Sequence, residues 1–187
     1  MIVTVPNPVL TTPAKKVKKI DRKINSVITR MMKALLNQDN PKGVGLAAPQ
    51  IGLSYRIFIT HPTSSSKIEV FLNPEIVWKS ETLVEIERAE KEDKKSLKND
   101  KKLEGCLSIP NVWGHLKRAN AVRLKYLDGQ GNSQEKEFKG FMATIVQHET
   151  DHLNGILFTQ RVLEQKEKLY EIEVDEEGKE KLVEIKL

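Results

Sequence analysis

The chain has 187 residues, 39% of them hydrophobic, which predicts one globular domain over residues 1–187 with a single core. The net charge of +5 is too small and too dispersed to assign a nucleic-acid partner, although it would suit an RNA-rich partner such as the ribosome. There is no apolar signal-peptide region, no stretch near the ~18 apolar residues of a membrane span, and only one cysteine. We therefore expect a cytoplasmic protein without internal disulfides, and no membrane or DNA partner.

The first elements are an extended arm and a helix. Three prolines favour an arm over residues 1–20, and a helix follows at roughly 21–38 with Asp21 as its N-cap. Its apolar residues have the spacing of one helix face, which predicts a core scaffold. They are Ile24, Val27, Ile28, Met31, Met32, Leu35 and Leu36. Strands rich in β-branched and aromatic residues are predicted at 56–60, 69–72 and 76–86.

The rest of the chain adds an insertion, a hairpin, a second helix and a tail. The nearly all-charged segment at about 85–103 predicts a solvated insertion. Alternation at 121–127, the turn DGQGN and the polar SQEKEFK predict a hairpin. A helix is expected at 141–154, stopped by Gly155, and strand, turn and strand at about 169–187. This order predicts an α+β fold of mostly antiparallel sheets around a central helix.

The second predicted helix carries the pattern H-E-x-x-H. His148 and His152 are four residues apart and share a helix face, so both imidazoles can bind one metal ion. Glu149 lies beside them and can reach a water molecule rather than the metal. The alternative is a surface helix that carries two histidines by chance. We favour the metal site because the pattern is rare in a chain of this length.

A catalytic site of this type needs a third protein ligand and an open position for water. A metzincin would have a histidine where this chain has Phe158, so that class is excluded. A gluzincin would use a later glutamate, and the candidates lie in a charged segment that resembles a solvated face: Glu164, Glu167 and Glu171. A lone cysteine such as Cys106 is more often a packed thiol, but the incomplete site favours it as the ligand. His61 and His115 are predicted to be surface histidines.

The segment GVGLAAPQIG at 43–52 has two possible meanings. It satisfies the loose dinucleotide fingerprint G-x-G-x-x-A, but a predicted helix precedes it and Pro49 interrupts the helix that such a fingerprint should open. We therefore interpret it as a small-residue segment that lets the backbone come close to a ligand. Gln50 then either caps a turn or presents its amide to the site.

Three segments in this order resemble the signature motifs of the peptide deformylases: GVGLAAPQ at 43–50, EGCLS at 104–108 and QHETDH at 147–152. The resemblance covers roughly residues 1–163, including LNPEI at 72–76. It implies a peptide-deformylase-like fold and hydrolysis of the N-formyl group from N-formylmethionine on new polypeptides, with release of formate. It also implies one divalent metal held by Cys106, His148 and His152. Fe(II) is the native metal of many members, and zinc or nickel also suits these ligands.

The resemblance also implies the roles of other residues. Glu149 would act as general base and then general acid, while the Gln50 amide and the Leu107 N–H would stabilise the oxyanion. The substrate-contacting residues would be Val44, Gly45, Gly105, Phe141, Thr144 and Ile145, with the peptide backbone added as a strand beside Val44–Gly45 and Gly105. Phe141 and Ile145 are equally well explained as core residues.

Some features depart from the family or leave a choice open. Trp113 either contacts the substrate beyond its methionine or packs on a sheet. The insertion is longer and more charged than the usual link, and the strand-like tail does not support ribosome docking through a C-terminal helix. The alternatives to the enzyme are a non-catalytic deformylase-like module that binds N-termini and a general zinc peptidase. The expected partners are N-formylmethionyl nascent peptides, with the ribosome as a further candidate.

Overall fold

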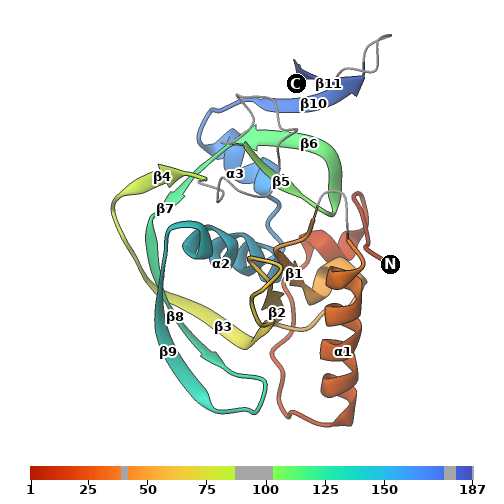
Figure 1. Ribbon diagram of the computed structural model, residues 1–187, viewed down its shortest axis with the longest axis vertical. Coiled ribbons are helices and arrows are strands. Elements are labelled where there is room, and N and C mark those ends of the chain that lie inside the picture. Colours follow the sequence, from red (N-terminus) through yellow and green to blue (C-terminus); the bar gives the residue numbers. More distant parts are fainter. Residues whose placement is uncertain (39–41, 87–102, 175–179, 187) are drawn as a thin grey trace.

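The computed structural model describes residues 1–38, 42–86, 103–174 and 180–186 (Figure 1). It confirms the α+β fold. The helical elements are η1 (Pro8–Thr11), α1 (Arg22–Leu36), η2 (Ala48–Ile51), α2 (Gly140–Leu153) and α3 (Phe158–Glu164). The strands are β1 (Gly45–Ala47), β2 (Ile57–Thr60), β3 (Glu69–Lys79), β4 (Leu83–Glu85), β5 (Leu103–Cys106), β6 (Ile109–His115), β7 (Lys117–Ala119), β8 (Ala121–Leu127), β9 (Ser133–Lys139), β10 (Leu169–Val174) and β11 (Glu180–Glu184).

The strands form three sheets, and all pairings between these strands are antiparallel. One sheet has the order β1-β2-β3-β8-β9, another the order β11-β10-β6-β5, and β4 pairs with β7. The five-stranded sheet curves around α2, while α1 and the β5–β6 hairpin lie on other sides of that helix (Figure 1). The central position predicted for the second helix is therefore confirmed.

Helix α1 forms as its sequence predicts. The Asp21 carboxylate accepts a hydrogen bond of 3.0 Å from the Ile24 N–H, which satisfies one free donor at the first turn. Five residues of the predicted stripe are buried against β1, β2 and η2, and Met32 is half-buried: the five are Ile24, Val27, Ile28, Met31 and Leu35. Leu36 is 55% exposed instead, because it is the last helical residue and lies about 100° around the helix from Leu35.

Helix α2 is held in place by packing against the five-stranded sheet and by two polar anchors outside that sheet. Ala143, Val146 and Leu153 belong to the apolar cluster that joins α2 to the sheet. The Gln147 amide pairs with both backbone groups of Ala119 on β7. At the other end the Arg56 guanidinium donates to the Leu153 carbonyl, and the cation also suits the negative end of the helix dipole. The face that carries the two histidines is thereby turned away from the sheet.

Several boundaries differ from the prediction. Leu103 is not part of a solvated insertion: it begins β5, pairs with His115 and is buried. Residues 87–102 of the predicted insertion lie outside the described residues. The predicted strand 76–86 is divided at Ser80, whose N–H bonds to the Ala121 carbonyl, and its second part forms β4. No secondary structure is predicted for the segment EGCLS, and its first three residues belong to β5, which a two-residue turn connects to β6.

The C-terminal part contains one helix that was not predicted. Helix α3 has only seven residues, too few for a periodic pattern, and it buries Phe158 and Val162 one turn apart. The predicted strands of the tail are confirmed as β10 and β11, and β10 extends the β5–β6 sheet through its pairing with β6. Among the helices in the described parts of the chain, none is both long enough and apolar enough to cross a membrane.

The N-cap of α1 provides a stability test. Asp21→Ala should lower the free energy of unfolding by about 1 kcal/mol, because the Ile24 N–H loses its partner. Urea unfolding measures the change. Ser26→Ala, at an exposed position of the same helix, is the control and should leave stability unchanged or slightly raised. Equal stability of Asp21→Ala and the unaltered protein would contradict the capping role.

Candidate metal centre

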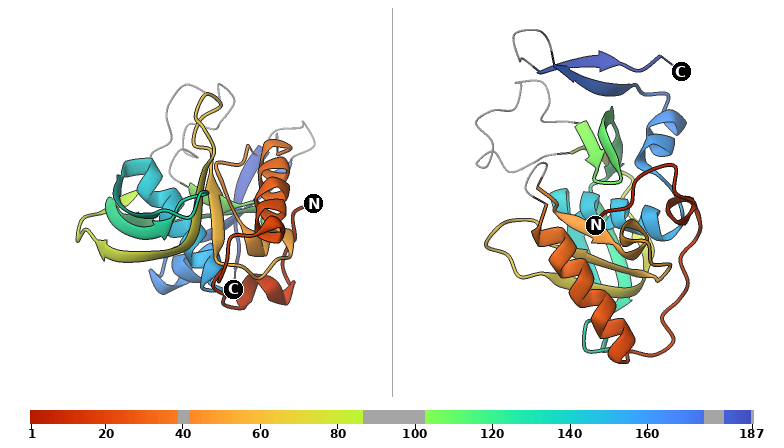
Figure 2. Two further views of the ribbon diagram at one scale, coloured as in Figure 1. Left: turned by 90° about the horizontal axis from the view of Figure 1, so that it is seen from below. Right: turned by 90° about the vertical axis from the view of Figure 1, so that its right-hand side faces the viewer.

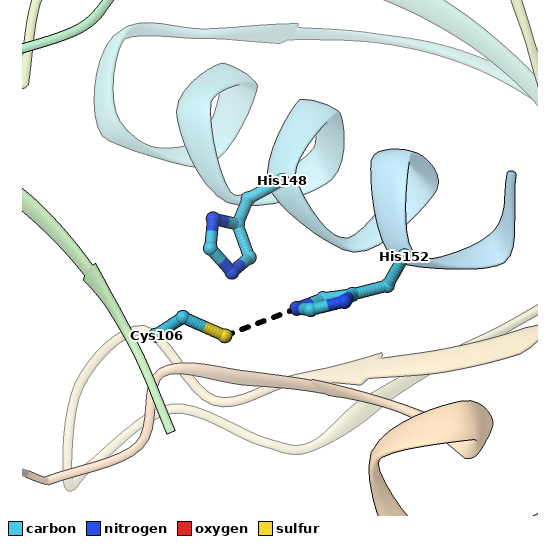
Figure 3. A group of neighbouring side chains, drawn as sticks. All are labelled: Cys106, His148 and His152. Atoms are coloured by element: carbon cyan, nitrogen blue, oxygen red, sulfur yellow. Dashed lines mark hydrogen bonds between the residues drawn. The ribbon is translucent and has the colours of Figure 1, made fainter. Parts of the chain in front are cut away.

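The three predicted ligands come together between β5 and α2. Cys106 is the last residue of β5, and His148 and His152 lie one turn apart on the facing side of α2 (Figure 3). Their ligand atoms all lie within 4.8 Å of one another, and Cys106 Sγ is 3.2 Å from His152 Nε2. Tetrahedral zinc bonds of 2.0–2.3 Å would place such atoms about 3.6 Å apart. The group therefore fits a divalent metal ion with adjustments of up to about 1 Å.

The surroundings of Cys106 favour its thiolate form, which is the form that binds a metal ion. Burial raises the pKa of Cys106, but the charge of His152 and hydrogen bonds with both histidines outweigh burial and lower the pKa to about 5. The Ser108 N–H and the Gln50 amide also point at the sulfur, at 3.4 and 3.5 Å. A thiolate with two imidazoles suits iron, nickel and zinc alike, so the donor set does not select among them.

Glu104 orients one of the two histidines. Its carboxylate lies 2.6 Å from His148 Nδ1, so Nδ1 carries the proton and Nε2 is left for the metal. Burial alone would lower the pKa of His148, but Glu104 and Cys106 outweigh it and raise that pKa well above its usual value. This glutamate belongs to the EGCLS segment, but no role was predicted for it because its partners are distant in the chain.

A buried ion cluster connects the centre to two other elements, β7 and α3. Arg118 on β7 donates two hydrogen bonds to Glu104, at 2.7 and 2.8 Å, and one of 2.9 Å to Asp151 on α2. Asp151 also accepts from Arg161 on α3 at 2.9 Å. Burial raises the pKa of Glu104, but Arg118 and His148 outweigh it and hold that pKa well below its usual range. Both carboxylates are therefore charged at neutral pH, and each charge is compensated.

Gln50 serves both of the purposes considered for it. It is 2% exposed, and its carbonyl oxygen accepts a 2.8 Å hydrogen bond from the Ala47 N–H, which caps the η2 turn. The opposite end of the amide therefore faces the centre, where Nε2 donates to Ser108 Oγ at 3.3 Å and to Cys106 Sγ. The turn-capping bond thus fixes which end of the amide a ligand would meet.

Glu149 lies beside the metal group (Cys106, His148 and His152). It is 4% exposed, and its Oε2 has no hydrogen-bond partner among the described residues. A Cβ atom on Gly45 would overlap Glu149 Oε1, so β1 and this carboxylate are in close contact. Burial raises the pKa of Glu149 to about 7, although the nearby histidines act in the opposite direction. A carboxyl group with such a pKa suits proton transfer near neutral pH.

The remaining predicted residues surround this centre. Thr144 and Ile145 are buried on α2, while Phe141, Val44 and Leu107 are half-buried. Phe141 and Ile145 belong to none of the three buried apolar clusters formed by the described residues. Ile145 is nevertheless only 3% exposed, so the substrate-contacting role of these two residues stays a prediction.

Trp113 packs on the sheet, one of the two alternatives. A Cβ atom on Gly105 would lie 2.7 Å from the Trp113 ring, so the indole covers the glycine across the β5–β6 pair. His115 packs edge-on against Tyr170, and His61 contacts Ser66. Within the described residues, the only group suited to a metal is the predicted one, without His61, His115 or the three later glutamates.

Comparisons with known proteins agree on one family. A family model described as polypeptide deformylase matches residues 1–168. The peptide deformylase of Dehalococcoides mccartyi is 37% identical over 181 residues, which cover 97% of this chain and 96% of that protein. Peptide deformylase 1 of Bacillus subtilis is 38% identical over 161 residues, 86% of this chain and 88% of that one.

Solved structures show the same likeness. The crystal structure of peptide deformylase from Thermotoga maritima matches with a TM-score of 0.72 and 32% identity, over 87% of this chain and 96% of that one. The enzyme from Synechococcus elongatus, solved in complex with actinonin, has the same TM-score and identity and covers 87% of this chain and 78% of that one.

The ion cluster should contribute strongly to stability. Arg118→Met leaves two buried carboxylates without their shared cation and should lower the free energy of unfolding by about 3–5 kcal/mol. The control is Arg123→Met, which breaks an exposed pair with Glu137 and should cost less than about 1 kcal/mol. Urea unfolding compares the two variants. Similar losses in both would contradict the importance of burial.

Glu104 should also affect metal affinity. Glu104→Gln removes the charge that orients His148 and should weaken metal binding about 10–100-fold. Competition with a chelator measures the affinity, and circular dichroism verifies that the variant is folded. Glu137→Gln, on exposed β9, is the control and should bind metal normally. Unchanged affinity in folded Glu104→Gln would rule out the orienting role.

Proposed function

The chain belongs to the polypeptide deformylase family, and we propose that it deformylates nascent peptides through the residues assembled around Cys106, His148 and His152. Peptide deformylases are metallohydrolases that remove the N-formyl group from the initiator methionine. The observation that carries the assignment of residues is the metal group on α2 and β5, with Glu149 and Gln50 on either side of it. The metal is Fe(II) in this proposal, which rests on the family resemblance.

Water supplies the attacking oxygen, and Glu149 transfers the proton of that water. When bound, the metal ion acts as a Lewis acid and lowers the pKa of a coordinated water toward neutrality. Glu149 accepts the proton of the attacking water and later donates it to the amine nitrogen as the C–N bond breaks. The products are formate and a free N-terminus. The burial of Glu149 supports this role, since the carboxylate is held next to the centre and away from bulk solvent.

Gln50 and Leu107 would stabilise the charge that develops on the formyl oxygen. Gln50 Nε2 faces the centre because its carbonyl end is bound to Ala47, so the donor needs no reorganisation when charge appears. Leu107 lies in the two-residue turn between Cys106 and Ile109, which brings its backbone close to the sulfur ligand. Loss of one such donor typically lowers the rate ~100–1000-fold.

Substrate recognition would combine a side-chain pocket with strand addition. Phe141, Thr144 and Ile145 precede His148 by seven, four and three residues, so they share its side of α2. Together with Val44 they would accept the methionine side chain. β1 and β5 are edge strands of two different sheets, and both border the centre. A peptide could therefore pair with Val44–Gly45 and Gly105 through its backbone, whatever its sequence.

This function places the chain with nascent polypeptides in the cytoplasm. The ribosome is a further proposed partner because it is the source of formylated N-termini. Docking through a C-terminal helix has no support, since the described part of the tail forms β10 and β11.

Formate release tests the activity and the role of Glu149. Anaerobically purified protein of known metal content should release formate from formyl-Met-Ala-Ser. Glu149→Ala should retain its metal but lose about 10²–10⁴-fold in kcat, because the general base is missing. Glu137→Ala is the matched control on exposed β9 and should keep full activity.

Two outcomes would contradict the proposal. Metal-loaded protein that binds the formyl peptide without releasing formate would instead be the N-terminus-binding module. Full activity in Glu149→Ala would assign proton transfer to another group.

A further inference from the structure

The charge of the chain is concentrated in its N-terminal fifth. Residues 1–38 contain eight lysines and arginines and a single acid, Asp21, which gives this segment a net charge of +7. Residues 39–187 contain 23 basic and 25 acidic residues, a net charge of −2. The positive charge of the protein is therefore located in one region, contrary to the expectation that it is dispersed.

Four of these cations form a regular array, which we call the lysine ladder: Lys15, Lys16, Lys18 and Lys19. All four side chains are exposed, whereas Ala14 and Val17 are buried and Ile20 is half-buried. Every third residue of the segment AKKVKKI thus faces the core, and the lysine pairs between them face solvent. The ladder lies on the outside of the molecule between η1 and α1 (Figure 2, right).

The backbone that carries the ladder is held in place. Ala14 N–H donates to the Leu153 carbonyl, and Lys15 exchanges backbone hydrogen bonds with Ser54 and Arg56. The Asn73 side chain then binds both backbone groups of Val17, at 2.7 and 2.8 Å. A partner would therefore meet a pre-ordered array and would lose little entropy in ordering its backbone.

The ladder charges are not neutralised within the protein. None of the four lysines takes part in an ion pair with any residue in the described parts of the chain. The nearby Asp21 is engaged as the N-cap of α1. By contrast, lysines on other faces lie beside glutamates, as Lys125 does beside Glu135 and Lys139 beside Glu137.

We propose that the lysine ladder is a docking surface for the phosphate backbone of an RNA helix. Residues 15–19 of an extended segment span about 13 Å, and a duplex carries one phosphate per ~1.7 Å of axis, so the ladder faces several phosphates at once. The apolar residues between the lysines (Ala14, Val17 and Ile20) pack against the core, whereas insertion into an anionic membrane would need apolar residues exposed beside the lysines. RNA is the polyanion that surrounds nascent chains, so this surface would bring the deformylase to its substrates.

Binding of a fluorescent RNA duplex to the full-length protein tests the proposal. Affinity should fall with salt between about 50 and 200 mM, with a slope of log K against log salt of about −3 to −4 for four phosphate contacts. The combined variant Lys15→Gln, Lys16→Gln, Lys18→Gln and Lys19→Gln should lose most of this slope and about 100-fold in affinity at the low-salt end, since each lysine contributes a slope of about one.

A control variant with the same change in net charge separates the ladder from overall charge. It combines Lys125→Gln, Lys136→Gln, Lys139→Gln and Lys168→Gln, all at lysines that lie beside glutamates. It should bind RNA within about threefold of the unaltered protein. Formate release by both variants should stay unchanged, which shows that they are folded and separates this proposal from the catalytic one.

Three results would overturn the proposal. Equal losses in the two variants would assign binding to net charge rather than to the ladder. An affinity for RNA that does not change with salt would show that phosphate contacts do not produce the binding. Tighter binding to vesicles that contain phosphatidylserine than to RNA would identify a membrane surface instead.

Discussion

The shared guanidinium of Arg118 is the constraint on which the metal group depends. The cysteine ligand belongs to one sheet, and the two histidines belong to a helix packed on another sheet. Arg118 bridges Glu104, two residues before the cysteine, and Asp151, one residue before His152. Because both carboxylates are buried and charged, neither can move away from the cation at low cost. The distance between β5 and α2 is therefore set by ionic contacts beside the ligands.

Glu104 connects this support to the chemistry. The same carboxylate that binds Arg118 also fixes the tautomer of His148. Glu104 therefore determines both where the His148 ring lies and which of its nitrogens carries the proton. Gln50 behaves similarly, since a structural bond at its carbonyl end directs its amino end toward the centre. In both cases one set of contacts binds the side chain to the fold, and the other set is made with the residues of the centre. Such residues make the site rigid before any substrate arrives.

The elements predicted from the sequence are those whose signals are local. The N-cap and stripe of α1, the β8–β9 hairpin and the two-histidine helix all follow from patterns within twenty residues of chain. The choice of Cys106 required elimination, and the structure supports it by bringing Sγ to His152. The single domain over residues 1–187 stays a prediction.

The features that could not be predicted depend on distant partners. Arg118 in KRAN resembles any surface arginine until the fold places it between two acids that are 47 residues apart. Helix α3 is too short to show a period, and Leu103 follows a charged run that hides the start of β5. The roles of Trp113 and Gln50 were likewise left open, because packing and donor direction are properties of three-dimensional neighbours.

The position of Trp113 gives the protein an internal optical probe. The chain has two tryptophans, and the other, Trp78, is 44% exposed on the outer part of β3, with Arg123 over its ring. Trp113 instead lies flat against Gly105, one residue before the cysteine of the metal group. Emission from the two indoles therefore arises in different surroundings. With Trp78 replaced by phenylalanine, the remaining fluorescence would report on the hairpin that carries Cys106, and hence on the loading state of the centre.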